Sequence, residues 1–502
     1  MPSHKRALPA PVCLLVVCLL FAACATRPPA PAPAPPAAGP APPSAAAVRT
    51  WTAAELRAEL AELYSGLQAA HYDLFAFRTK ADYDRQYAAT REAIRDGMTA
   101  REVVRLFQPF VAFGRVGHAR LDFPVADYIA AARDGGKILP LDIRVEDGRV
   151  FVAYDYTGDP RLAPGTELLS LDGRPMAEEV AAIGRYVSGE TDYFVHAQLE
   201  EYFPRWLWLD RGSIDRFTLE VARPEGRTTV TVAGQPIGEV EPLKSQWSTR
   251  LHEREVRILD GGIAYLRPGP FYNVDGGDSM DVTAFHAFVD QAFAQVLAAG
   301  AGKLIVDVRN NPGGDNSFSD HLVAWFAARP FRFSDAFHLK ASPQTLAAYA
   351  PKPGEPYDAA GLVGRMYGEM SRRGAGETFL FDLSYVEPRA ASRFGGRVYV
   401  LVNRHSYSNS ASMAAMVQDY GFATILGEET GDLPTTYASS VRFTLPRTGL
   451  SVSYPKSYFV RPNGDRSLRG VVPDLAIPTP RPGASTAPDP VLDAAIALVR
   501  GH

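Results

Sequence analysis

Two segments of the sequence end an apolar run with residues that suit catalysis. The first, Val306-Asp-Val-Arg-Asn-Asn-Pro-Gly-Gly314, has glycines that can turn backbone amides toward a ligand without interference from a Cβ atom. The second, Val402-Asn-Arg-His-Ser-Tyr-Ser-Asn-Ser-Ala-Ser412, is a strand followed by a hydroxyl-rich turn and a helix. A serine at a helix start lies in a positive field that stabilises developing negative charge, as a serine nucleophile requires. The alternatives are a tight turn and a helix cap, which is the commoner use of serine.

Together these segments resemble the C-terminal processing, or tail-specific, serine peptidases and their relative, the tricorn core protease. That family carries Leu-Asp-Leu-Arg-x-Asn-x-Gly-Gly, Val-Asn-x-Gly-Ser-Ala-Ser-Ala-Ser-Glu, Val-Gly-Glu-x-Thr and Gly-x-x-Pro-Asp, in that order. The sequence matches these motifs in the same order at 306–314, 402–412, 426–430 and 470–474. The resemblance implies a serine-type endopeptidase with a multi-domain α/β fold: an N-terminal helical domain, a PDZ-like β module and a crotonase-like or ClpP-like peptidase domain.

The resemblance also implies the nucleophile and the oxyanion hole. Gln418 and Asp419 match the family's Leu-Gln-Asp, and counting back from them places the nucleophile at Ser408 and not at the neighbouring serines. The backbone amides of Gly313 and Asn409 would hold the oxyanion, and each such donor is worth several kcal/mol in the transition state.

The general base of this chain must differ from the lysine that the best-known members of the family use. They carry a lysine in Thr-Phe-Gly-Lys, whereas this chain reads Thr430-Gly-Asp-Leu433. Because a free serine hydroxyl is a poor nucleophile, either another residue is the base or the protein is inactive. The tricorn branch uses a histidine, and Phe113-Gly-Arg-Val-Gly-His-Ala-Arg-Leu121 stands in the corresponding place. The base is therefore predicted to be His118, whose ordinary pKa suits proton transfer at neutral pH.

Three further residues stay open as partners in this chemistry. His405 is a weaker rival for the base because it lies three residues before Ser408. Glu428 and Glu429 are candidates to orient the imidazole, but acidic residues in that loop could equally be solvated. A structural, hydrogen-bonded histidine is the alternative for His118. The third member of the site is left unassigned.

Residues 250–480, which contain both motif-bearing segments, show the pattern of an α/β peptidase domain. Continuous apolar runs predict strands buried on both faces, and helical stretches lie between them. The runs are Leu304–Val306, Val398–Val402 and Thr424–Leu426, and the helical stretches are Val282–Ala299 and Ser410–Val417. Residues 481–502 are expected to form a C-terminal segment with a short helix.

Residues 49–135 are predicted to form the helical domain. Thr52 with Glu55, and Thr99 with Glu102, each have the spacing of a capping box, in which side chain and backbone satisfy each other at a helix start. Apolar pairs flank both boxes as hydrophobic staples, and these are Trp51 with Leu56 and Met98 with Val103.

Residues 136–235 change to short strands divided by Asp-Gly and Pro-Gly turns. The strand-like runs are Leu139–Val145, Val150–Tyr154 and Phe217–Ala222. Leu162–Pro175 resembles the part of PDZ domains that reads Pro-Gly-Asp-x-Ile-x-x-Ile-Asn-Gly, and a PDZ fold binds peptide by adding it to a sheet edge. The alternative is a β module that only packs against its neighbours.

The N-terminus predicts export. Lys5 and Arg6 precede an apolar run, Val12–Cys24, that is too short to span a membrane, so residues 1–23 are expected to be a signal peptide. Ala22 and Ala23 before Cys24 resemble a bacterial lipoprotein cleavage box, which implies lipidation of Cys24, and an ordinary secretory signal is the alternative. Residues 24–48 are expected to form a tether, since nine of the sixteen residues from 28 to 43 are Pro and favour extended geometry.

Composition excludes several other classes. All three cysteines lie in the export segment, so a Cys nucleophile or thiolate-bound metal is not expected in the mature chain. A net charge of −4, without clustered Lys and Arg, argues against nucleic acid. No His-Glu-x-x-His pattern occurs, so a metal hydrolase is not favoured and no cofactor is expected.

The sequence thus predicts an enzyme that hydrolyses polypeptides in the cell envelope. It would be held by an N-terminal lipid anchor, in the outer membrane facing the periplasm. The alternative is a catalytically inactive, peptide-binding lipoprotein on the same scaffold.

Overall fold

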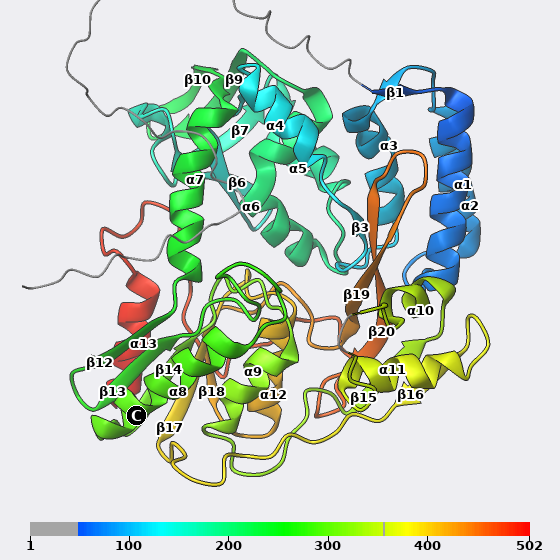
Figure 1. Cartoon of the computed structure of the whole chain (residues 1–502). Coiled ribbons are helices and arrows are strands. Elements are labelled where there is room, and N and C mark those ends of the chain that lie inside the picture. The colour runs from blue at the N-terminus through cyan, green and yellow to red at the C-terminus, as the bar shows by residue number, and fades with distance from the viewer. Residues whose placement is uncertain (1–48, 355–356, 502) are drawn as a thin grey trace, which may run out of the picture.

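The computed structural model describes residues 49–354 and 357–501 and has a mixed α/β fold (Figure 1). The predicted signal peptide, the lipidation site at Cys24 and the tether lie outside the described residues. In the described part of the chain, no helix is both long enough and apolar enough to cross a membrane.

The sheet that carries the site runs through residues 255–476 in the order β12-β13-β14-β17-β18-β21. The five strands from β13 onward are parallel, and β12 pairs with β13 in the antiparallel sense. The strands are β12 (Glu255–Leu259), β13 (Ile263–Arg267), β14 (Lys303–Asp307), β17 (Arg397–Val402), β18 (Thr424–Gly427) and β21 (Leu475–Ala476). The three predicted apolar runs lie in β14, β17 and β18, and these predictions are confirmed.

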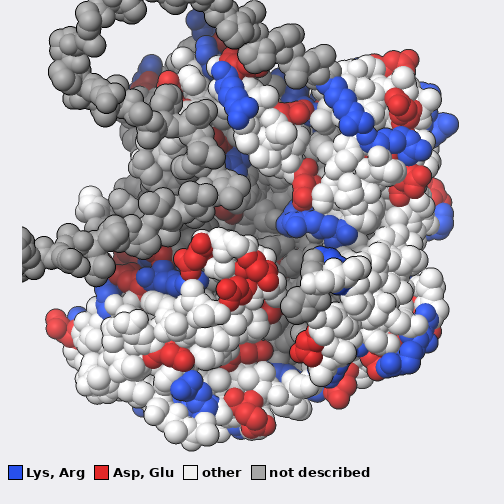
Figure 2. Space-filling view, viewed as in Figure 1, with Lys and Arg blue, Asp and Glu red and all other residues white. Residues whose placement is uncertain are grey.

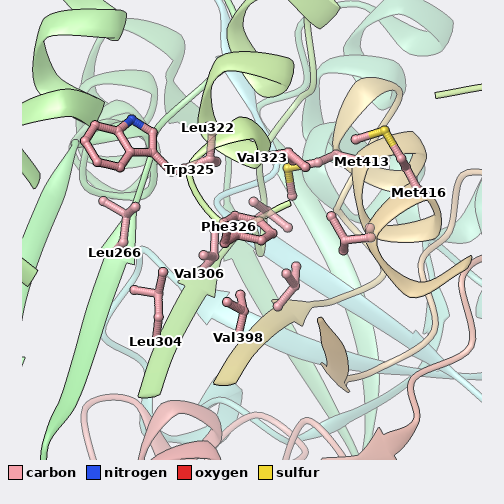
Figure 3. Close-up of a cluster of buried hydrophobic side chains, with 14 of the residues drawn as sticks. Leu266, Leu304, Val306, Leu322, Val323, Trp325, Phe326, Val398, Met413 and Met416 are labelled. Carbon is pink, nitrogen blue, oxygen red and sulfur yellow. The ribbon is translucent and has the colours of Figure 1, made fainter. Parts of the chain in front are cut away.

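Helices cover both faces of this sheet, which explains why its strands are apolar on both sides. On one face lie α8 (Thr283–Ala298), α9 (Asn316–Ala324) and α12 (Asn409–Asp419), and on the other lies α13 (Pro490–Gly501). Figure 3 shows the first interface, where Val306 and Val398 from the strands face Leu322 and Met413 from the helices. The predicted helices at 282–299, 410–417 and the C-terminal segment are therefore present.

A second sheet, which the sequence did not predict, lies beside the first in the order β16-β15-β20-β19. Its strands are β15 (Ala336–Lys340), β16 (Thr378–Phe381), β19 (Thr436–Thr444) and β20 (Ser451–Val460), with α10 (Pro343–Tyr349) and α11 (Leu362–Ser371) between β15 and β16. The short strand β3 (Arg120–Leu121) pairs with β20 at Ser453 and Val452. This pairing attaches the N-terminal part of the chain to the part that contains the two sheets.

The N-terminal segment contains the predicted helices. In α1 (Ala53–Ala70) and α3 (Ala100–Ala112), both capping boxes are formed as expected. The four predicted staple residues are buried in one cluster. A third capping box, Thr79 with Asp82, starts α2 (Lys80–Glu92). Also in this segment are β1 (Thr50–Trp51), β2 (Met98–Thr99) and α4 (Val125–Arg133).

The segment from 136 to 235 contains a six-stranded sheet in the order β10-β9-β7-β6-β5, with β8 beside β7. Two helices that the strand pattern did not predict, α5 (Met176–Gly184) and α6 (Asp192–Arg211), belong to it as well. The strands are β5 (Leu141–Glu146), β6 (Arg149–Asp155), β7 (Glu167–Leu171), β8 (Arg174–Pro175), β9 (Arg216–Arg223) and β10 (Gly226–Ala233). The remaining elements are β4 (Lys137–Ile138), β11 (Gln235–Pro236), the 3₁₀ turn Pro160–Leu162 and α7 (Ile237–His252).

The mixed α/β class is confirmed. The helical domain, the PDZ-like module and the domain boundaries stay predictions. On the face drawn in Figure 2, basic and acidic side chains are interspersed among other residues over the described surface.

Candidate active site

Ser408 stands at the sharp turn between β17 and α12. Its backbone has φ 53° and ψ −121°, a conformation that non-glycine residues adopt only at a cost of about 1–3 kcal/mol. The side chain makes no capping hydrogen bond to the helix that follows it. The helix-cap alternative is therefore wrong for this serine, because its hydroxyl does not satisfy the helix start.

The two motif-bearing turns lie side by side because β14 and β17 are adjacent parallel strands. The Ser406 hydroxyl donates to the Val308 carbonyl at 2.8 Å, and the Tyr407 amide donates to the Asn311 carbonyl at 3.0 Å. The carboxyl ends of the two strands are thus bonded to each other directly before the nucleophile position.

Gly313 and Asn409, the predicted oxyanion donors, flank Ser408. Gly313 has φ +81°, and a Cβ atom there would lie 2.9 Å from the Ser408 Cβ atom and 2.7 Å from the Asn409 nitrogen. The Asn409 amide has no acceptor among the described residues, whereas the Gly313 amide donates to Asn311 Oδ1 at 2.9 Å. Gly314 offers a further amide without an acceptor in the described chain. Both predicted assignments stay predictions.

His118 lies between α3 and β3, and its ring reaches Ser408 from 290 positions away in the sequence. Its Nε2 atom is 3.2 Å from Ser408 Oγ. The ring stacks on Tyr407 with centroids 5.1 Å apart, and the His118 carbonyl accepts the hydroxyls of Ser440 and Ser453. The imidazole is 6% exposed, and its Nδ1 atom has no partner among the described residues.

Two buried acids that the sequence analysis did not name complete the surroundings of His118. Asp432 Oδ2 accepts the Ser408 amide at 2.6 Å and lies 4.0 Å from His118 Nε2. Glu190 Oε1 accepts the Gly117 amide and the Thr436 hydroxyl, both at 3.2 Å. Asp432 lies in the Thr430–Leu433 segment, where the family carries its lysine. The departure from the family motif in this segment could therefore have indicated Asp432 as a residue of the site. Nothing in the sequence around Glu190 indicates its role.

Burial shifts the pKa of each of these three groups toward its neutral form. It lowers the pKa of His118 to about 3, with a smaller contribution from the charge of Arg120. It raises the pKa of Glu190 to about 7. Burial also raises the pKa of Asp432 well above its ordinary value, and the negative charge of the Glu190 carboxyl raises it further.

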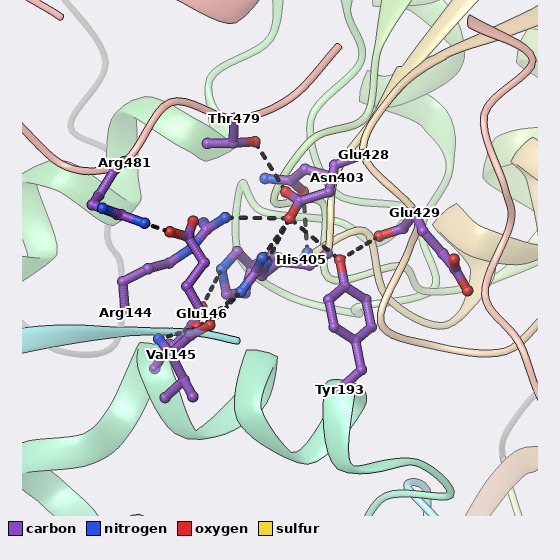
Figure 4. Close-up of polar contacts among 12 residues, drawn as sticks. Arg144, Val145, Glu146, Tyr193, Asn403, His405, Glu428, Glu429, Thr479 and Arg481 are labelled. Atoms are coloured by element: carbon purple, nitrogen blue, oxygen red, sulfur yellow. Dashed lines mark hydrogen bonds and ion pairs between the residues drawn. The ribbon is translucent and has the colours of Figure 1, made fainter. Parts of the chain in front are cut away.

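The other sequence candidates lie in a separate polar network (Figure 4). Glu428 accepts hydrogen bonds from Arg404 and Arg144, and Glu429 accepts from Arg469. His405 Nε2 lies 3.5 Å from Glu200 Oε2. The contacts of His405 and Glu428 tie the nucleophile turn to α6 and β5. None of the three candidates contacts Ser408 or His118 in the described chain.

No lysine takes the place of the family's missing base among the described residues. The buried Lys456 has a pKa lowered to about 7 by burial. Its Nζ, however, donates to the carbonyl and hydroxyl of Ser439 and not to Ser408.

Comparison with known proteins gives a family match for the part of the chain that contains Ser408. Residues 263–477 match the model of peptidase family S41. The crystal structure of mature CPAF is 18% identical with a TM-score of 0.62, and the match covers 89% of this chain and 96% of that one. Mature CPAF complexed with lactacystin is 16% identical with a TM-score of 0.60, covering 89% and 97%. The photosystem II D1 C-terminal processing protease is 16% identical with a TM-score of 0.40, covering 84% and 92%.

The fold and the family match define a serine-type peptidase. The S41 match spans the residues that carry the four motifs, and the likeness to mature CPAF shows a common fold.

Replacing Gly313 by Ala should lower peptidase activity by about 100-fold, the loss typical of a displaced oxyanion donor. The new Cβ atom would lie 2.5 Å from the Tyr407 carbonyl oxygen, so the turn beside Ser408 must shift. Hydrolysis of an unstructured peptide measures the loss. Gly376→Ala is the matched control, because Gly376 has a similar φ of +88° and a Cβ atom there meets nothing within 4 Å. Equal activity in both variants would contradict this role for the turn.

Glu190→Gln should be more stable than the wild type by an amount that increases as the pH rises. The unfolded carboxyl ionises near 4.5, whereas the folded one has a pKa of about 7. Between these values the unfolded wild-type chain releases a proton that the folded chain keeps, so the wild-type free energy of unfolding falls. Glutamine does not titrate, and the advantage of the variant should grow by about 3 kcal/mol up to pH 7 and then level off. Denaturant unfolding from pH 4.5 to 8 tests this, and a pH-independent difference would contradict it.

Proposed function

We propose that this protein hydrolyses peptide bonds by acyl transfer through Ser408, with His118 as the base. The observation that carries the proposal is the 3.2 Å separation between His118 Nε2 and Ser408 Oγ. Such a contact is within the reach required for proton transfer between a serine and its base.

The steps follow from the positions of these groups. His118 Nε2 takes the hydroxyl proton as Ser408 Oγ forms a bond to the substrate carbonyl carbon. The Asn409 amide holds the oxyanion together with the Gly313 amide, which leaves Asn311 Oδ1 to do so. Collapse breaks the C–N bond, and the proton on Nε2 passes to the leaving amine. A water molecule then cleaves the acyl ester by the same route.

A non-catalytic peptide-binding lipoprotein is the competing proposal. The strained backbone of Ser408 and its uncapped hydroxyl favour catalysis. Strain of this kind persists where it presents a reactive group, whereas peptide binding by itself gives no reason to retain it.

Ser408→Ala should abolish hydrolysis of an unstructured peptide, by a factor of about 10³ or more, and leave the fold intact. A fluorophosphonate probe should label the wild type and not the variant, because only an activated serine reacts with it. Ser410→Ala is the matched control, since the Ser410 hydroxyl is buried without a partner, and it should retain activity and labelling. Undiminished turnover in Ser408→Ala would end the proposal, and a folded, unlabelled wild type would favour the binding protein.

The proposed setting is the cell envelope, with a lipid anchor on Cys24 in the outer membrane facing the periplasm. The support comes from the basic, apolar and small residues that precede Cys24 and from the Pro-rich tether after it. Residues 136–235 are proposed to be a PDZ-like module, which the six-stranded sheet with α5 and α6 supports. The substrates would be polypeptides of that compartment.

Cys24→Ser should move the protein from the membrane fraction to the soluble fraction of the envelope, because the lipidated side chain is lost. Cys18→Ala leaves the proposed modification site untouched and serves as the control. Immunoblots of the two fractions make the measurement. A Cys24→Ser protein that stays with the membrane would overturn the anchor.

A further inference from the structure

Asp432 is held rigidly beside the nucleophile. It lies between β18 and β19, and its side chain is 1% exposed. Its Oδ2 atom accepts the Ser408 amide at 2.6 Å, and its Oδ1 atom accepts its neighbour's amide, that of Leu433, at 2.9 Å. The Thr430 hydroxyl donates to the Asp432 carbonyl at 2.8 Å. Both carboxylate oxygens therefore have fixed directions, and one of them bonds the residue that carries the reactive hydroxyl.

This placement differs from that of the acid in a Ser-His-Asp triad, which bonds the Nδ1 side of the imidazole. In this site Nδ1 has no partner among the described residues. Asp432 lies instead on the Nε2 side, 4.0 Å from the atom that faces Ser408 Oγ. The carboxylate is thus close to the place where positive charge appears when the imidazole takes the serine proton.

The other charged or titratable groups around His118 are less well placed for this task. Tyr407 stacks on the ring through its aromatic face. Glu190 bonds the Gly117 amide and not the imidazole. Arg120, two residues further on, carries positive charge and disfavours a second one on the ring. In the described chain, Asp432 is the one acid within ion-pair distance of the His118 ring.

We propose that Asp432 is the positioning residue of this site, holding the Ser408 backbone in its strained conformation and neutralising the imidazolium that forms on His118. This role rests on the proposed function of Ser408 and His118. Burial disfavours a charge on either group alone, whereas the two backbone amides that Asp432 accepts favour its carboxylate form. The two ionisations are therefore those of a coupled pair.

This coupling determines the direction in which a neutral side chain at position 432 shifts the pKa of His118. An anion beside the imidazole favours its protonated form and raises its pKa. Asp432→Asn removes the anion but keeps the shape and one oxygen for the Ser408 amide. The His118 pKa should therefore fall by at least about one unit, and the acid limb of kcat/KM should move to lower pH with it. A weaker base should also lower kcat/KM near pH 7.5 by about 10- to 1,000-fold.

The experiment compares the imidazole ¹⁵N titration of His118 with the pH profile of kcat/KM in the full-length wild type and in Asp432→Asn. The His118 resonance is assigned by its loss in His118→Gln. Asp290→Asn is the matched control, because Asp290 accepts a hydrogen bond from His321 at 2.7 Å on the α8–α9 side of the domain. It should change the titration of His321 and leave that of His118 unchanged.

The outcomes separate this inference from the function on which it rests. A wild type that neither cleaves peptide nor reacts with fluorophosphonate overturns the proposed function, and the ¹⁵N titration still decides whether Asp432 and His118 are coupled. An active wild type whose His118 titrates at the same pH in Asp432→Asn overturns the role of Asp432. Should Asp432→Asn fail to fold, Asp432→Glu keeps the charge and should keep the wild-type acid limb even where kcat falls. Loss of that limb in a folded Asp432→Glu also overturns the role.

Discussion

The approach of His118 to Ser408 depends on the docking of the N-terminal part of the chain against the second sheet. The pairing of β3 with β20 sets the path of the backbone, and the Ser440 and Ser453 hydroxyls hold the His118 carbonyl. Hydrogen bonds of this kind are directional and fix both position and orientation. Since the nucleophile belongs to one part of the molecule and the base to another, the site exists only while these parts are docked.

Burial gives this junction its chemical character. His118, Asp432 and Glu190 are each less than a tenth exposed, and an isolated charge at such a depth is costly. A charge on one of these groups is therefore favourable only when an opposite charge forms beside it. The strain at Ser408 and the desolvation of the acids both reduce stability, and the apolar layers on the two faces of the large sheet offset them.

The sequence predicted those parts of the fold and site that rest on local patterns. The apolar runs indicated β14, β17 and β18, and the Thr-x-x-Glu spacing indicated the starts of α1 and α3. It did not predict the sheet formed by β15, β16, β19 and β20, whose strands pair across long separations. It also proposed Glu428 and Glu429 near the imidazole, whereas both pair with arginines elsewhere.

By itself, the sequence determined that a serine follows a buried strand at a helix start and that a glycine turn ends a second such strand. These are interactions among near neighbours in the chain, and spacing is enough to reveal them. The tertiary structure alone decided the distance between His118 and Ser408, the side of the imidazole on which Asp432 lies, and the direction in which burial shifts their pKa values. Each of these depends on groups brought together from several elements, because distance and desolvation are properties of the assembled interior.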